Sequence, residues 1–180
     1  HLVCSWAEGA RWNIGTIRLD NGVLEKWNVD WSPIGNVASD LGRVVLLASA
    51  PDQLPAIISL ENGQTQIIRA SSVVTINEDQ ISTEQHIEWT NRDGSTGHGL
   101  YYPPVSSEFV GPTSELPPLL VMVRPLPTTS ARGGLTVALQ YWTSRGFAVL
   151  EPNPRGSTGY GRDYREELNE RWGELDVMDV

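Results

Sequence analysis

Two segments place a serine among glycines, a setting that suits a nucleophilic hydroxyl. Residues 94–97 and residues 156–159 both read Gly-Ser-Thr-Gly. A serine nucleophile held on a strained turn requires the spacing Gly-x-Ser-x-Gly, which exposes the hydroxyl above a sheet. That spacing occurs nowhere in the 180 residues. We therefore interpret Ser95 and Ser157 as turn residues, because serine beside glycine is common in turns.

The other residue types that carry chemistry lack partners in the sequence. His98 and His86 each stand alone, and a lone histidine is usually an ordinary surface residue or a satisfied one. Cys4, the single cysteine, lies in a strand-like run and is interpreted as a small buried hydrophobe. No Cys/His cluster has the spacing of a metal site. We predict neither a metal nor a cofactor. The carboxylates of the last helical segment have the spacing of a solvated helix face: Glu166, Glu167, Glu170 and Glu174.

Composition indicates a folded chain and argues against two classes of partner. Apolar residues make up 39% and charged residues 19%, a globular balance. The formal net charge is -9, and no run of Lys and Arg forms a basic patch. Phosphate binding requires such a patch, so nucleic acid is not an expected partner. A membrane span requires about 18 consecutive apolar residues, and the longest candidate, at 116–123, is far shorter.

The first half contains an internal repeat. Residues 17–22 (Ile-Arg-Leu-Asp-Asn-Gly) match residues 58–63 (Ile-Ser-Leu-Glu-Asn-Gly), a period of 41 residues that also aligns Val3 with Val44. Propeller blades recur at roughly 40–50 residues. Each Asn-Gly pair lies between strand-like runs, which predicts a hairpin with a two-residue turn. The repeat favours propeller blades, and two hairpins that resemble each other by chance are the alternative.

The second half has the pattern of an α/β unit. Residues 119–123 and 147–150 are continuous apolar runs, typical of strands buried on both faces. A helix is expected between them, at about 130–145, with an apolar stripe of Leu135, Ala138, Leu139 and Trp142. A Gly-rich loop at 155–161 leads to a further helix near 163–172, with Tyr164, Leu168 and Trp172 as its stripe. Residues 174–180 read as the opening of another helix.

These segments resemble the prolyl oligopeptidase family of serine peptidases, and within it the dipeptidyl aminopeptidase and acylaminoacyl-peptidase group. The resemblance is most specific at residues 140–162, which include Arg-Gly-Ser-Thr-Gly-Tyr-Gly-Arg, and weak in the repeat. It implies a β-propeller followed by an α/β-hydrolase domain with a Ser-His-Asp triad. It also implies that short peptides are the substrates. In the family, all three triad residues come later in the chain than the position that corresponds to residue 180.

Two loops depart from the family pattern. After the first apolar run the family usually has His-Gly-Gly-Pro, which shapes the oxyanion side of the site, and this chain has Arg124, Pro125, Leu126 and Pro127. After the second run the family usually has Asn-Tyr-Arg-Gly-Ser, and this chain has Pro154 in place of the tyrosine. Proline has neither a hydroxyl nor a backbone N–H, so it cannot donate to an oxyanion. We interpret Arg124, Pro125 and Pro154 as degenerate oxyanion-region positions.

Together these observations predict a mixed fold: the end of a β-propeller, followed by the N-terminal part of an α/β-hydrolase domain. We expect C-terminal propeller blades at 1–75, connecting strands and a linker at 76–118, and the hydrolase part at 119–180. The chain is expected to be a fragment of a cytoplasmic serine-type peptidase, inactive alone because it lacks the nucleophile. The alternatives are a non-enzymatic peptide- or protein-binding propeller homologue and an esterase on the same scaffold.

Overall fold

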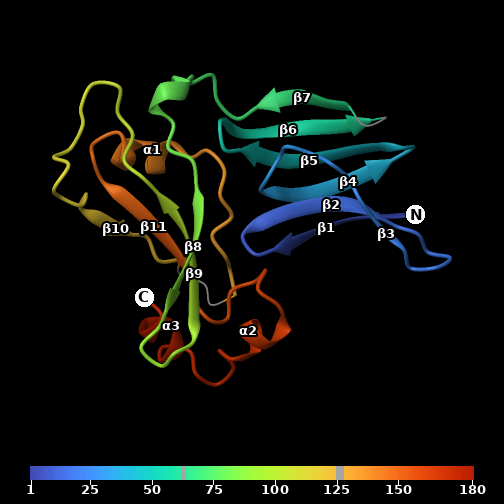
Figure 1. The fold of residues 1–180 in the computed structure, drawn as a ribbon. Coiled ribbons are helices and arrows are strands. Elements are labelled where there is room, and N and C mark those ends of the chain that lie inside the picture. The colour runs from blue at the N-terminus through green and yellow to red at the C-terminus, as the bar shows by residue number, and fades with distance from the viewer. Residues whose placement is uncertain (62–63, 125–127) are drawn as a thin grey trace. The chain divides into compact units, whose positions relative to one another are not determined.

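A computed structural model describes residues 1–61, 64–124 and 128–180. The chain divides into two compact units (Figure 1). Unit 1 comprises residues 1–75 together with 132–135, and unit 2 comprises residues 76–131 together with 136–180. Strands make up most of unit 1, whereas unit 2 combines short strands with short helices.

Unit 1 contains two antiparallel sheets, each in sequential strand order. The first consists of β1 (Leu2–Glu8), β2 (Arg11–Ile17) and β3 (Leu24–Lys26). The second consists of β4 (Ile34–Asp40), β5 (Arg43–Ala50), β6 (Gln53–Glu61) and β7 (Gln64–Ala70). The sequence repeat relates β1 to β5, β2 to β6 and β3 to β7. It is therefore a repeat of whole strands, as expected.

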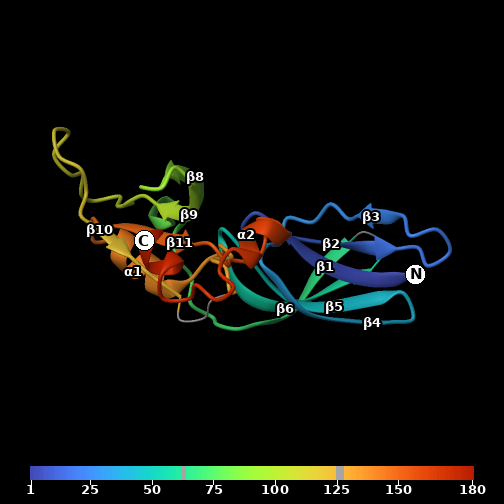
Figure 2. The ribbon, with the colours of Figure 1, turned by 90° about the horizontal axis from the view of Figure 1, so that it is seen from below.

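The core of unit 1 lies between these sheets, which form two layers in Figure 2. Ile14 from β2 is in one apolar cluster with Ile34 from β4 and Ile58 from β6. Partly buried tryptophans pack against this cluster: Trp12, Trp27 and Trp31. Alternation along each strand sends every second side chain into the layer between the sheets, so one short apolar pattern per strand is enough to build the core.

The hairpins of unit 1 differ from the prediction. The first Asn-Gly pair lies in a four-residue connection, because the Arg18 N–H bonds to the Val23 carbonyl at 3.0 Å. The two-residue turn predicted there is wrong. The second pair, at 62 and 63, lies outside the described residues. A two-residue turn does occur where none was predicted, at Leu41 and Gly42 between the paired Asp40 and Arg43, with φ angles of 45° and 83°.

Unit 2 contains a mixed sheet in the order β10-β11-β9-β8. Its strands are β8 (Gln85–Thr90), β9 (Thr96–Tyr102), β10 (Leu119–Val121) and β11 (Ala148–Asn153), and a short 3-10 helix, η1 (Glu78–Gln80), precedes them. The β10 and β11 pair is parallel, as predicted, and the other pairs are antiparallel. Leu119 and Val121 are exposed, so burial of this run on both faces is wrong. The reason is that β10 pairs only with β11 in the described sheet.

The helix between β10 and β11 is shorter than predicted. Helix α1 spans Val137–Thr143, because Gly133 and Gly134 have positive φ angles of 72° and 83° that a helix cannot contain. Its buried residues are Leu139, Gln140 and Thr143, whereas Ala138 of the predicted stripe is exposed. The buried glutamine is explained by Ser82, whose backbone N–H donates to Oε1 at 2.8 Å and whose carbonyl accepts from Nε2 at 2.9 Å.

Two short helices complete unit 2. Helix α2 covers Arg162–Glu166 and helix α3 covers Leu175–Met178. The predicted continuation to Trp172 is wrong: Glu170 has a φ of 62°, which ends the helical run, and Trp172 is 66% exposed. Leu168 of the same predicted stripe is buried. The helical opening predicted at 174–180 is confirmed by α3.

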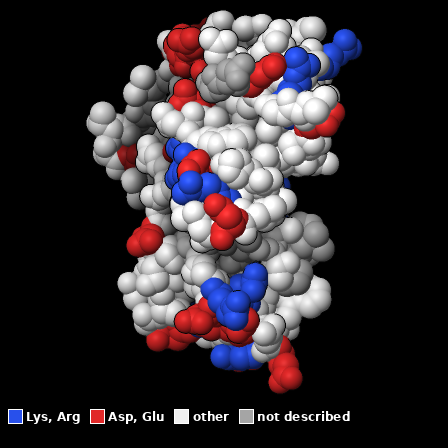
Figure 3. All heavy atoms as spheres, turned by 90° about the vertical axis from the view of Figure 1, so that its right-hand side faces the viewer, with Lys and Arg blue, Asp and Glu red and all other residues white. Residues whose placement is uncertain are grey.

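The surface shows mixed charge. On the face in Figure 3, Lys and Arg alternate with Asp and Glu and do not gather into one basic patch. Ion pairs join some of the charged residues of the chain across strands, such as Arg43 with Glu61 at 3.1 Å and Lys26 with Glu8 at 3.6 Å. None of the described helices has the length and hydrophobicity that a bilayer span requires.

Candidate functional site

The loops that follow β10 and β11 are joined to each other. The backbone N–H and the hydroxyl of Thr158 both donate to the Thr128 carbonyl, at 3.3 Å and 2.8 Å. The backbone N–H of Ala131 donates to Oδ1 of Asn153 at 2.6 Å. Ligand sites in open α/β sheets form beyond the carboxyl ends of parallel strands. The joined loops lie at such an edge, which makes them the candidate site.

Asn153, the last residue of β11, organises this edge. Asn153 has no exposed surface, and its Oδ1, Nδ2 and backbone carbonyl each have a hydrogen-bond partner. Its Nδ2 donates to the Tyr160 hydroxyl at 2.9 Å, and its backbone carbonyl accepts from the Tyr164 hydroxyl at 2.7 Å. Because Oδ1 receives Ala131, the side-chain amide has only one orientation that satisfies both ends. Asn153 thus fixes the positions of both tyrosines and of the loop after β10.

His98 lies next to this asparagine. It pairs with Asn153 in the register of β9 and β11. Its ring stacks on Tyr160 with centroids 4.3 Å apart and meets Tyr164 edge-on at 5.3 Å, while Nδ1 lies 3.1 Å from Oε1 of Glu88. This histidine was expected to be an ordinary surface residue or a satisfied one, and the structure gives its ring contacts with both tyrosines and with Glu88. Sequence reasoning missed its place against the two tyrosines, which only the register reveals.

Arg124 follows β10 and compensates a buried charge. Its Nη2 lies 2.9 Å from Oε1 of Glu151, a buried carboxylate on β11. The Tyr102 hydroxyl donates to the other oxygen, Oε2, at 3.3 Å. Burial, and then the nearby Glu151 charge, raise the pKa of Tyr102 far above its usual range, so this hydroxyl stays protonated. Pro125, the neighbouring position of the predicted oxyanion region, lies outside the described residues.

Pro154 follows Asn153 and begins a tight turn. Its carbonyl accepts the Ser157 N–H at 3.0 Å. The Ser157 side chain is buried, and its hydroxyl has no hydrogen-bond partner among the described residues. In the other Gly-Ser-Thr-Gly segment, the Ser95 hydroxyl donates to Oδ1 of Asp93 at 2.6 Å. Both serines therefore lie in turns, and neither presents an exposed hydroxyl of the kind a nucleophile requires.

A buried ion-pair network holds the turn after Pro154. The Arg155 side chain is 6% exposed, and its Nη2 lies 2.6 Å from Oδ1 of Asp179, whose side chain has no exposed surface. The backbone N–H of Arg155 donates to Oδ2 of the same residue at 2.7 Å. Asp93 and Glu167 lie 2.8 Å and 3.7 Å from Arg155 Nη1. The hydrogen bonds that the guanidinium donates to Asp179 and Asp93 raise the pKa of Arg155 further, so the guanidinium is always charged.

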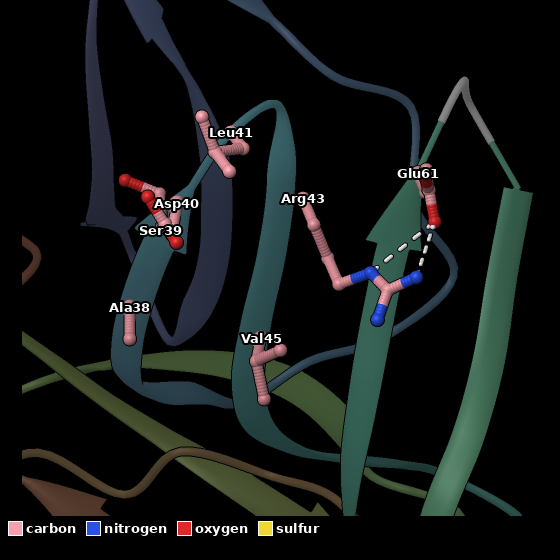
Figure 4. Close-up of a pocket in the computed structure, with 7 residues that line it drawn as sticks. All are labelled: Ala38, Ser39, Asp40, Leu41, Arg43, Val45 and Glu61. Carbon is pink, nitrogen blue, oxygen red and sulfur yellow. Dashed lines mark hydrogen bonds and ion pairs between the residues drawn. The ribbon is translucent and has the colours of Figure 1, made fainter.

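Each unit also has a surface hollow that residues other than those of this edge line. In unit 1, residues 38–45 and Glu61 surround a hollow of about 410 Å³, where Arg43 donates to Glu61 from Nε and Nη2 (Figure 4). In unit 2, residues 104–118 and 143–146 line a groove of about 930 Å³. Neither contains a candidate catalytic group. Among the residues that the structure describes, no group of three or more His, Cys, Asp and Glu side chains is placed to hold a metal.

Comparison with known proteins agrees with the resemblance seen in the sequence. Residues 135–180 match the model of the prolyl oligopeptidase family. A puromycin-hydrolyzing peptidase of Mycobacterium tuberculosis superposes on 98% of the chain with a TM-score of 0.90 and 29% identity. The chain belongs to the prolyl oligopeptidase family. Its two sheets in unit 1 match the β-propeller portion of these relatives.

Two further relatives are similar to most of the chain. A puromycin hydrolase in complex with PGG matches 96% of the chain at 33% identity, with a TM-score of 0.84. YuxL of Bacillus subtilis, described as an uncharacterized peptidase, is 25% identical over 81% of the chain. The chain covers 28%, 26% and 22% of the lengths of these three relatives.

Proposed function

We propose that this chain is part of a serine-type peptidase that hydrolyses short peptides, and that residues 119–180 form the N-terminal part of its α/β-hydrolase domain. One observation carries the proposal. In a chain of the prolyl oligopeptidase family, the loops after two parallel strands are joined around a buried asparagine at the carboxyl edge of the sheet. That edge is where such sheets place their sites.

The domain organisation follows the same reasoning. We assign residues 1–75 to propeller blades, residues 76–118 to connecting strands and linker, and residues 119–180 to the hydrolase part. The 41-residue strand repeat in unit 1 supports the first assignment. The parallel strands joined through a helix support the third, because this connection is the basic unit of α/β folds.

The reaction would be acyl transfer by a serine, with histidine as the base and an oxyanion hole for the tetrahedral intermediate. No Gly-x-Ser-x-Gly occurs in the 180 residues, so we place the triad outside them and expect this chain alone to be inactive. In α/β-hydrolases, the loop between the third strand and the first helix contributes an oxyanion N–H. Here the corresponding loop, between β10 and α1, contains Arg124 and Pro125.

The residues at 124 and 154 determine how large a kcat we expect for the complete peptidase. Pro154 offers no donor next to the end of β11, and Arg124 is engaged with Glu151. Loss of one oxyanion donor typically lowers kcat by about 10²- to 10³-fold. A non-enzymatic peptide-binding homologue is the second candidate function, and the same two positions favour it. The named activities of the relatives, one of them a hydrolase in complex with PGG, favour a peptide or aminoacyl amide as the ligand in either case.

The test uses the complete gene product that contains this chain. We expect its reading frame to supply Gly-x-Ser-x-Gly, Asp and His, and the purified protein to cleave fluorogenic dipeptide amides. A serine-directed phosphonate should label it and stop turnover. The matched control is the variant with alanine at the elbow serine, which should neither turn over substrate nor become labelled. Peptide binding without turnover or labelling would refute the peptidase and establish the binding homologue.

A further inference from the structure

Three tyrosine hydroxyls lie around the end of β11, and one keeps a proton to donate. Tyr102 donates to Glu151, and Tyr164 donates to the Asn153 carbonyl. The Tyr160 hydroxyl instead accepts a hydrogen bond, from Nδ2 of Asn153 at 2.9 Å. Its own proton has no acceptor among the residues that the structure describes. Of these three tyrosines, Tyr160 is therefore the one whose hydroxyl proton remains available to a ligand.

The geometry around Asn153 enforces this arrangement. Oδ1 of the amide receives the backbone N–H of Ala131 at 2.6 Å, so the donor end of the amide must face Tyr160. A hydroxyl that accepts from an amide N–H cannot also donate to it. The ring cannot swing away easily, since it stacks on His98 at 4.3 Å with an interplanar angle of 21°. The hydroxyl is thus held with its proton directed away from Asn153.

We propose that the Tyr160 hydroxyl is a catalytic donor, which gives a hydrogen bond to the reacting carbonyl oxygen of the substrate as that oxygen becomes an oxyanion. The inference rests on the proposed peptidase function. Through Asn153, the hydroxyl is tied to Ala131 in the loop between β10 and α1, and this loop flanks the oxyanion in α/β-hydrolases. Pro154, the residue after Asn153, has no donor of its own.

Electrostatics suits a hydrogen-bond donor that keeps its proton. Burial raises the pKa of Tyr160, and the hydrogen bond from Asn153 only partly opposes this effect. The phenol therefore stays neutral at neutral pH. A preorganised neutral donor stabilises negative charge as it develops, without any proton transfer.

The experiment compares Tyr160→Phe with wild type in the complete gene product. The substitution removes one oxygen and retains the ring that stacks on His98. We expect kcat to fall by about 10²- to 10³-fold, while KM changes by less than roughly threefold, because the bond forms only in the transition state. The affinity for a peptide aldehyde, whose adduct with serine mimics the intermediate, should fall by a similar factor.

Tyr141→Phe is the matched control, because it removes the same phenol oxygen from helix α1, where Tyr141 is 50% exposed and outside the candidate site. It should leave the melting temperature nearly unchanged and kcat within roughly threefold of wild type. An active wild type whose Tyr160→Phe variant retains kcat and aldehyde affinity would overturn the role of Tyr160 alone. A wild type with neither turnover nor phosphonate labelling would overturn the peptidase function and this role together.

Discussion

Apart from the tyrosines, Asp179 should be the residue of the candidate site whose substitution lowers the stability of the chain most. Its carboxylate receives the backbone N–H of Arg155, the guanidinium of the same residue and Nδ2 of Asn91. The substitution Asp179→Asn retains the shape but removes the charge. It also places an amide N–H where at least one of these donors now points. We expect the turn that follows Pro154 to lose its anchor.

The magnitude follows from burial. Removing one partner of a buried ion pair costs about 3–5 kcal/mol, because the other charge remains desolvated. Asp93 and Glu167 still face the Arg155 guanidinium and keep part of the compensation. We therefore expect the lower end of the range, about 3 kcal/mol. For a chain of this size, that loss lowers the melting temperature by about 6–12 °C.

Thermal unfolding of the 180-residue chain, followed by circular dichroism, measures this shift. Hydrogen exchange of the Arg155 amide gives the local effect, since that N–H loses its acceptor. Glu174→Gln is the control: it breaks the solvent-exposed pair with Arg171, at 2.9 Å, and should leave the melting temperature unchanged. If Asp179→Asn melts within about 2 °C of wild type with the Arg155 amide equally protected, Asp179 does not anchor the turn.

Three further changes test other parts of the structure. Leu41→Asn should stabilise the chain by about 1 kcal/mol, because Leu41 is 99% exposed and has a positive φ that asparagine tolerates. Gly42→Ala should destabilise it, because alanine does not tolerate the positive φ at that position. If both variants melt at the wild-type temperature, the turn geometry is wrong. Gln140→Leu should lower the free energy of unfolding, measured in urea, by about 2–4 kcal/mol, because the backbone N–H and carbonyl of Ser82 lose their partners. An unchanged free energy of unfolding would contradict this pairing. Hydrogen bonds from the Ser95 side chain and backbone, and then from Arg155, lower the pKa of Asp93. The contribution of Asp93 to stability should therefore be complete above its ordinary pKa of 3.8 and decline as the pH falls further. If the loss of stability in Asp93→Asn is constant from pH 7 to pH 2, Asp93 does not make this pH-dependent contribution.

The strand pattern of unit 1 was predictable because it is local. Alternating apolar residues determine which face of a strand is buried, and a repeat of 41 residues marks equivalent strands. The turns were less predictable. Asn-Gly at 21 and 22 lies in a longer connection, while Leu41 adopts a left-handed conformation for which leucine has no preference. Sheet pairing on both sides imposes that conformation, and no local pattern encodes it.

The helices of unit 2 show where periodicity fails. An apolar stripe predicts α1 on the assumption that buried residues are apolar, but Gln140 is buried because it pairs with the backbone near Ser82. That partner is 58 residues away in the chain. Likewise, the apolar run at β10 was expected to be buried, and its exposure depends on which strands pair with it. Both errors arise from contacts that are distant in sequence.

The candidate site was only partly visible in the sequence. The loops after the two apolar runs were predicted from the rule that sites form at the carboxyl edge. The cluster of Asn153, His98 and Tyr160 was missed, because these residues come from two strands and a loop and form no linear motif. The signal that could have found it is the antiparallel register of β9 and β11, which places His98 opposite Asn153.

Two prolines in the β11 region show why the altered site is compatible with an intact sheet. The Leu150 carbonyl accepts the Met122 N–H at 2.8 Å, so alternate residues of β11 from Leu150 onward direct their backbone groups towards β10. Pro152 and Pro154 continue that alternation beyond the last β10 pair, at Val121 and Leu150. Pro152 has no N–H to continue this ladder, and Pro154 lies beyond its end, so the missing N–H of Pro154 removes no ladder bond. Proline at 154 thus lacks a hydrogen-bond donor without destabilising the sheet, while the Tyr160 hydroxyl at the same edge can still donate its proton. The substitution thus changes which residue can supply the donor and leaves the scaffold that positions it unchanged.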